Sequence, residues 1–138
     1  MPGVIRDSRL LMAVAHIKAE EYAAGALEQS WGRLQWLAGS HLDNAEGLTL
    51  GRVLIWRGHS NPRHCHPSCE EVLYLLAGRL EHTLGSGTFV LEPGDSLAIP
   101  AGVFHNATSI GDVDADMMVA YSTGTRDYVA EPVQPVAP

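Results

Sequence analysis

Turn-forming residues divide most of the chain into short segments, and this spacing limits the fold more than any other feature of the sequence. Glycine, proline and aspartate recur every eight to twelve residues, and the segments between them are rich in alternating apolar residues. The expected strands are residues 31–38, 48–56, 71–76, 79–84, 88–91, 96–99, 103–108 and 115–122. Many short strands at this spacing predict an all-β sandwich or barrel.

Three regions are expected along the chain. An N-terminal extension covers residues 1–33 and contains one short helix within Ala19–Leu27, where helix-forming residues surround Gly25. The β domain covers residues 34–122. The tail, residues 123–138, carries prolines at positions 132, 135 and 138 and is expected to be extended or disordered beyond Val129. A chain of 138 residues has room for one domain with a real core.

Composition excludes several classes of protein. Apolar residues make up 46% of the chain and charged residues 18%, which is typical of a globular domain. The formal charge of −7 argues against nucleic acid or an anionic membrane as a partner. The apolar stretch Leu10–Ala15 is short for a signal peptide and is followed by His16 and Lys18, so a cytoplasmic location is expected.

The stretch from Gly58 to Gly78 carries the chemistry. His64 and His66 are two residues apart, so both point to the same face of an extended strand. A turn over residues 67–69 leads into the strand that begins at Glu71, and an antiparallel pair joined there would aim all three side chains at one point. His105, after a Pro/Gly turn, is available as a fourth ligand. Imidazole nitrogens with one carboxylate oxygen suit a first-row transition metal.

At these residues the chain resembles the cupin superfamily. The first motif of that family, G-x5-H-x-H-x4-E-x6-G, is met by Gly58, His64, His66, Glu71 and Gly78. The second, G-x5-P-x-G-x2-H-x3-N, is met by Gly94, Pro100, Gly102 and His105. It departs at the last position, where Ser109 replaces asparagine, while Asn106 directly follows the histidine. This departure affects the local turn and not the metal ligands.

The resemblance implies a small jelly-roll barrel, also called a double-stranded β-helix, with one site in its mouth. It also implies one divalent transition metal (Mn, Fe, Ni or Zn) bound by His64, His66, Glu71 and His105. Four protein ligands would close a tetrahedral zinc site, whereas a six-coordinate ion keeps two positions open for a substrate.

Two functions remain open at this point. The first is a metal-dependent enzyme of the dioxygenase or isomerase/lyase type, acting on a small aromatic, enol or keto-type molecule. The alternative is a non-catalytic cupin that binds a small molecule or a sugar. An intact ligand set favours the enzyme, since a carbohydrate-binding protein has no need of it.

His82 is a further candidate for the site. It shares a strand face with Leu80 and Leu84, so an inward orientation would make it a pocket residue able to carry a proton. The alternative is a core or rim histidine with a local hydrogen bond. Met118 and Tyr121 have opposite parity in the last strand, so at most one of them lines the pocket.

The two cysteines allow two interpretations. Cys65 and Cys69 form a C-x3-C pair beside the histidines, which would fit a zinc–thiolate site. However, Cys65 lies between His64 and His66 and therefore points to the opposite face. We expect both to be free thiols in a reducing compartment.

The strand over residues 71–76 is apolar on both faces. If Glu71 points inward, Leu73 and Leu75 do so too, while Val72, Tyr74 and Leu76 face outward. A strand of this kind is normally covered on both sides. Either the N-terminal extension or a second subunit supplies the cover, and the cupin resemblance implies a homodimer.

Overall fold

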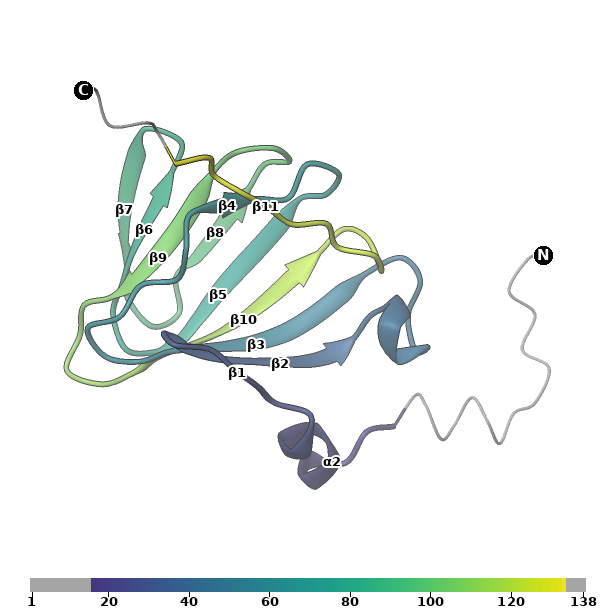
Figure 1. The fold of residues 1–138 in the computed structure, drawn as a ribbon. Coiled ribbons are helices and arrows are strands. Elements are labelled where there is room, and N and C mark those ends of the chain that lie inside the picture. Colours follow the sequence, from purple (N-terminus) through teal and green to yellow (C-terminus); the bar gives the residue numbers. More distant parts are fainter. Residues whose placement is uncertain (1–15, 134–138) are drawn as a thin grey trace.

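The structure, a computed structural model, describes residues 16–133 as two antiparallel β-sheets that face each other (Figure 1). The six-stranded sheet has the order β1 (Leu27–Glu28), β2 (Gly32–Ala38), β3 (Thr49–Ile55), β10 (Ala115–Tyr121), β5 (Glu71–Ala77) and β8 (Ser96–Ile99). The five-stranded sheet has the order β11 (Val129–Ala130), β4 (His64–Cys65), β9 (His105–Ser109), β6 (Leu80–Leu84) and β7 (Gly87–Leu91). The predicted all-β jelly roll is confirmed.

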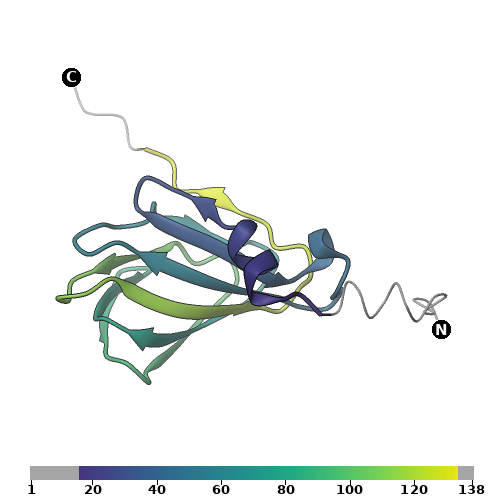
Figure 2. The same cartoon turned by 90° about the horizontal axis from the view of Figure 1, so that it is seen from below.

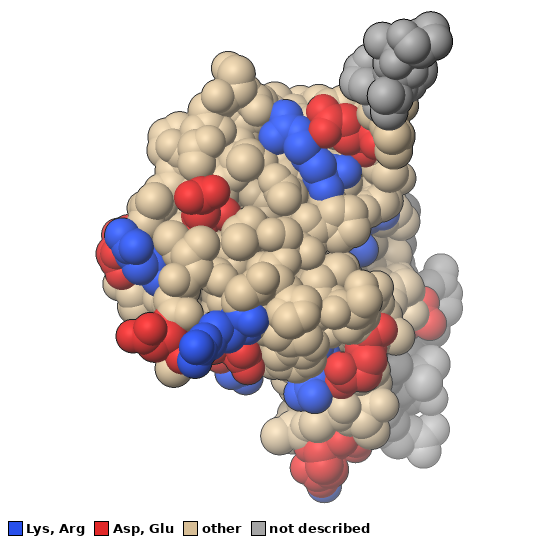
Figure 3. All heavy atoms as spheres, turned by 60° about the vertical axis from the view of Figure 1, so that its left-hand side comes forward, with Lys and Arg blue, Asp and Glu red and all other residues tan. Residues whose placement is uncertain are grey.

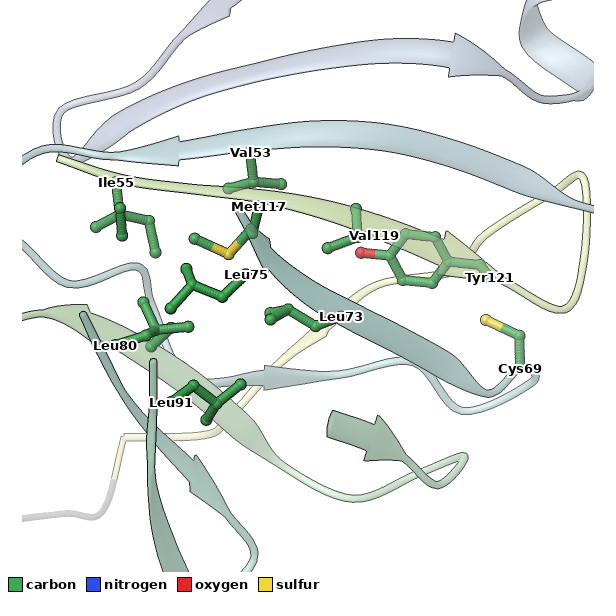
Figure 4. Close-up of a cluster of buried hydrophobic side chains, with 12 residues drawn as sticks. Val53, Ile55, Cys69, Leu73, Leu75, Leu80, Leu91, Met117, Val119 and Tyr121 are labelled. Atoms are coloured by element: carbon green, nitrogen blue, oxygen red, sulfur yellow. The ribbon is translucent and has the colours of Figure 1, made fainter. Parts of the chain in front are cut away.

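The core lies between the two sheets and is formed by every second residue of the long strands. In β5 the odd-numbered residues Leu73 and Leu75 are buried, whereas Val72, Tyr74 and Leu76 face outward. The inward side chains of β3, β5, β6, β7 and β10 meet in one cluster (Figure 4). A fully buried leucine such as Leu75 contributes roughly 1.5–3 kcal/mol to the stability of the fold.

Two glycines are required by the backbone. Gly85, in the hairpin between β6 and β7, has a φ of 59°, which glycine adopts without a steric cost. Gly78, after β5, has a φ of 86°, and a Cβ atom there would lie 2.8 Å from backbone atoms of both Asp114 and Ala115. The glycine at each position therefore lets the chain turn between consecutive strands, within one sheet at Gly85 and from one sheet to the other at Gly78.

One expectation about the strands is wrong. The strand that carries His64 was expected to pair with the strand that begins at Glu71, but β4 and β5 lie in different sheets. β5 has seven residues and finds hydrogen-bond partners in both β10 and β8. The short β4 pairs with β9 and β11 instead, and the turn after His66 crosses from one sheet to the other. His64 and Glu71 of the first motif therefore lie in opposite sheets.

The predicted N-terminal helix is confirmed over a shorter range. Helix α2 (Ala19–Ala24) ends at Gly25 and contacts β2 from outside the sheet (Figure 2). The 3-10 helix η1 (Ser40–Leu42) follows β2. The stretch Leu10–Ala15 lies outside the described residues. Within residues 16–133, no helix is long and apolar enough to cross a membrane. The cytoplasmic location and the absence of a nucleic-acid partner stay predictions.

The charged side chains of the surface are mixed in sign. On the face shown in Figure 3, lysine or arginine lies beside aspartate or glutamate, and uncharged surface separates these groups. Two of the ion pairs join Arg79 to Glu92 at 2.7 Å and Arg63 to Glu131 at 2.8 Å. Exposed pairs of this kind contribute between 0 and about 1 kcal/mol each, so they do not decide the fold.

Candidate metal centre

The structure brings all four predicted ligands together between the sheets. The antiparallel pairing of β4 with β9 sets His64 opposite His105, and their ring centroids lie 4.4 Å apart. One ring nitrogen from each of His64, His66 and His105 lies within 4.8 Å of the others. Glu71 approaches from the opposite sheet, with Oε1 3.3 Å from His66 Nε2 and 3.2 Å from His105 Nε2.

Hydrogen bonds to the backbone fix the tautomer of each of the three imidazole rings. Each Nδ1 lies at hydrogen-bond distance from a carbonyl oxygen: 2.7 Å from Pro62 for His64, 2.6 Å from Asp127 for His66 and 2.9 Å from Val103 for His105. A carbonyl oxygen can only accept, so Nδ1 must carry the proton. The Nε2 atom of each neutral ring therefore presents a lone pair, and a backbone partner of this kind is typical of metal-binding histidines.

The donor set fits a divalent transition metal. The Nε2 atoms of His66 and His105 and Oε1 of Glu71 are buried, and none has a hydrogen-bond partner. Lone pairs that face each other at about 3 Å in a buried place are costly unless a cation or a proton lies between them. The three imidazole nitrogens lie close enough to hold one ion together, and Glu71 as the fourth ligand stays a prediction.

The surroundings favour the metal-binding forms of these side chains. Burial lowers the pKa of His64 to about 4, so this imidazole is neutral at neutral pH. Burial alone would raise the pKa of Glu71, but the imidazoles of His105 and His66, whose Nε2 atoms lie 3.2 and 3.3 Å from its carboxylate, lower it to about 2. The site thus presents an ionised carboxylate and a neutral His64.

His82 lies beside the cluster without joining it. Its ring stacks on that of His105, with the centroids 5.7 Å apart and the planes 14° from parallel. Its Nδ1 donates to the carbonyl oxygen of Thr83 at 2.8 Å, and burial lowers its pKa to about 4. His82 is therefore a buried, locally hydrogen-bonded histidine that also lines the cavity. Its role in proton transfer stays a prediction.

No residue of the segment that covers the centre was expected from the sequence to be functional. Residues 126–131, here called the C-terminal strap, run beside β4 through the pairing of β11 (Figure 1). The carbonyl oxygen of Asp127 accepts from His66 Nδ1, and the ring of Tyr128 stacks on His64 at 4.7 Å and 18°. The one signal in the sequence was the short apolar run from Tyr128 to Ala130.

A cavity opens from the centre toward solvent. The free space inside it is about 90 Å³, which leaves room for several water molecules or a small ligand group. Its walls are mainly apolar or aromatic: Trp31, Leu34, Trp36, Val53, Leu73, Met117, Val119 and Tyr121. Polar groups are contributed by His64, His82, His105, Glu71, Asn61, Arg126 and Tyr128. At most one of Met118 and Tyr121 was expected to line the pocket, and the structure shows that Tyr121 does and Met118 does not.

Tyr121 places a phenol beside the centre. Its ring lies 4.9 Å from that of His66, and the side chain is buried. Burial raises the pKa of Tyr121 well above its usual value, and the negative charge of Glu71 adds to this effect. The phenol therefore stays protonated and can act as a hydrogen-bond donor toward the site.

Neither cysteine belongs to the group of side chains that could hold an ion. Cys65 and Cys69 are buried and unpaired, and among residues 16–133 the group that could bind an ion consists of histidines. Cys69 packs in the core at the same end as Tyr121 (Figure 4), and burial raises the pKa of its thiol. A raised pKa disfavours the thiolate form that would bind a metal.

Replacing both cysteines by serine is therefore expected to leave the metal content unchanged. The variant C65S/C69S should stay folded but lose some stability, because a buried hydroxyl group without a hydrogen-bond partner costs about 1–3 kcal/mol. Elemental analysis of the purified protein, with circular dichroism to confirm the fold, makes the measurement. Loss of the metal from a folded variant would show that a thiolate belongs to the ligand set.

Two facing antiparallel sheets with a histidine cluster between them define a jelly-roll protein with an internal metal-type site. The family model described as the cupin domain matches residues 51–121, which is half of the chain. The matched region contains the four predicted ligands. The chain belongs to the cupin family.

Curated relatives and solved structures agree with this assignment. A germin-like protein of Oryza sativa subsp. japonica (3-8) is 33% identical over 92 residues, which cover 63% of this chain and 41% of the relative. Polyketide synthase CurC of Streptomyces cyaneus is 35% identical over 69 residues, or 50% of this chain and 45% of the relative. Oxalate decarboxylase from Bacillus subtilis superposes with a TM-score of 0.73 at 18% identity, over 80% of this chain and 30% of that one. The chain thus spans less than half the length of these relatives.

Proposed function

We propose that this cupin is a metal-dependent enzyme that acts on a small organic molecule held between its sheets. The observation that carries the proposal is the convergence of three bare imidazole nitrogens and one carboxylate oxygen at the inner end of a cavity. A bound divalent ion would act there as a Lewis acid on an oxygen atom of the substrate. The reaction would be of the dioxygenase or the isomerase/lyase type.

Different residues of this chain would have different roles in the reaction. His64, His66, His105 and Glu71 would hold the ion, and the backbone carbonyls behind the rings would keep the rings in position. The apolar walls would hold an aromatic, enol or keto-type body and exclude water from the reacting atoms. Tyr121 can donate a hydrogen bond to a substrate oxygen, and His82 is the candidate for accepting a proton.

A non-catalytic binding module is the second candidate. It is favoured less because sugar recognition needs many polar groups, whereas this cavity has mainly apolar walls. The name of the structural neighbour, an oxalate decarboxylase, also supports an enzyme. Fold alone cannot decide between the two.

The proposal is tested with protein purified without added metal and then loaded separately with Mn, Fe, Ni or Zn. A panel of aromatic, enol and keto compounds is screened for oxygen uptake and, by proton NMR, for isomerisation or bond cleavage. We expect turnover with at least one metal and none in the metal-free protein. Binding of compounds without turnover under all four metals would favour the binding module instead.

We also propose that the protein forms a homodimer through the outer face of β5. Val72, Tyr74 and Leu76 are 48%, 45% and 42% exposed, and residues 16–33 lie at the other end of this sheet, along β2. An apolar row of this kind is typical of a surface that a partner covers.

Light scattering at micromolar concentration is expected to give twice the mass of one chain, which is 14.9 kDa. The change Tyr74→Lys, in the middle of the row, should shift the protein to monomer, while Glu81→Lys on the exposed side of β6 should not. A wild-type protein that stays at the mass of one chain would contradict the proposal.

A further inference from the structure

A single guanidinium group stands in the wall of the cavity. Arg126, the first residue of the C-terminal strap, lies over two aromatic rings, with Cζ 4.5 Å from the ring centroid of Trp36 and 5.3 Å from that of Tyr121. Both rings also line the cavity. Stacking on aromatic faces fixes the plane of the guanidinium and leaves the N–H groups at its edge free to donate.

The charge of Arg126 has no acidic partner in the described part of the chain. None of the ion pairs among residues 16–133 includes it. Among the residues that line the cavity, Glu71 is the one carboxylate, and it faces the imidazoles of His66 and His105. With a divalent ion in place, the formal charges of ion, guanidinium and carboxylate are +2, +1 and −1, a total of +2. A cavity with this excess attracts an anion.

The rest of the cavity limits the shape of that anion. Leu34 and Val53 from the six-stranded sheet, and Trp31 just before β2, give it broad apolar walls. A sugar phosphate would bring many hydroxyl groups that these walls cannot satisfy, and each unsatisfied group would weaken binding. A flat hydrocarbon or aromatic body fits the walls, and a carboxylate fits the planar donor edge of a guanidinium.

We propose that the cavity selects small organic carboxylates with a flat apolar body, and that Arg126 binds the carboxylate group. This inference rests on the proposed function only in taking the cavity as the substrate site. It assigns Arg126 as a specificity residue, a role that neither of the two sequence motifs includes.

The test compares two probes that differ in one charge, phenylpyruvate and its methyl ester, by calorimetric titration of the metal-loaded protein. The variants are R126Q, which removes the charge, R126K, which keeps the charge without the planar fork, and R79Q. R79Q is the matched control, because Arg79 is an exposed arginine paired with Glu92 outside the cavity. Metal content is measured for every variant.

We expect wild type and R79Q to bind the acid at least about tenfold more tightly than the ester. R126Q should lose most of this preference, through weaker binding of the acid alone, and R126K should be intermediate. Full metal content in R126Q would show that the centre is intact. Retention of the preference in R126Q would mean that the metal alone selects the acid, which overturns the proposal.

Two other outcomes also decide the question. Equal affinity of wild type for acid and ester, or no binding of either at about 10 mM, overturns the role of Arg126. The proposed enzyme function is judged separately by turnover, so a carboxylate preference without turnover supports this inference while it contradicts the enzyme. Turnover of uncharged substrates, without any preference for the acid over the ester, would support the enzyme function and contradict the role of Arg126.

Discussion

Replacing His64 and His66 together with alanine is expected to abolish metal binding. The change removes two of the three imidazole nitrogens that lie within 4.8 Å of one another, and the remaining pair of His105 and Glu71 cannot complete a site for a transition metal. We expect the metal content to fall from about one ion per chain to less than about a tenth of that value. Elemental analysis of protein purified without added metal makes the measurement.

The control for this experiment is His59→Ala. His59 is exposed, and its Nδ1 interacts with the carbonyl oxygen of Arg57 outside the cavity, so its loss should leave the metal content unchanged. The double variant should stay folded, because the hydrophobic core cluster between the sheets includes neither histidine. Full metal occupancy in a folded H64A/H66A variant would show that the ion binds elsewhere.

Ending the chain after Thr125 is expected to weaken metal binding by about 10–100-fold, the usual effect of losing groups that orient metal ligands. This truncation removes the carbonyl of Asp127 that holds His66, the ring of Tyr128 that stacks on His64, and the pairing of β11 with β4. His66 would lose its hydrogen bond and His64 its stacking partner, so both rings would be held less firmly at the centre. Competition with a fluorescent chelator gives the affinity.

A chain that ends after Glu131 is the matched control, since it keeps the whole C-terminal strap. Its affinity should stay within about twofold of wild type. The change Tyr128→Ala in the full chain separates the stacked ring from the backbone contacts and should have a smaller effect than the truncation. If the chain that ends after Thr125 binds metal as tightly as wild type, the strap does not position the ligands.

The sequence was sufficient to predict the long strands of the barrel and the residues that meet at its centre. Strand β5 shows why: its alternation of apolar residues fixes which side chains face inward, so Glu71, Leu73 and Leu75 could be assigned to one face. The cupin motifs then identified His64, His66 and His105 by their spacing. Both kinds of signal are local, since they depend on neighbours within a few residues.

The parts that could not be predicted depend on contacts between distant segments. The partner of β4 is one example, because a strand of two residues carries no pattern that distinguishes pairing with β5 from pairing with β9. The strap is another. Asp127 acts through its backbone carbonyl, which every residue possesses, so its side chain gives no indication of the contact with His66. Arg126 has a defined neighbourhood only after β2 and β10 bring Trp36 and Tyr121 together.

The contact between His66 and Asp127 joins residues that are 61 positions apart, and this separation bears on the order in which the protein folds. The hairpin of β6 and β7 closes a short loop and loses little chain entropy, whereas the strap closes a very long one. Contacts of such long range form late, once most of the barrel has been assembled. A metal that binds only the finished arrangement would therefore be absent from the rate-limiting step of folding. Its stabilising effect would fall on the reverse reaction, so a bound ion would hold the folded chain by slowing its unfolding.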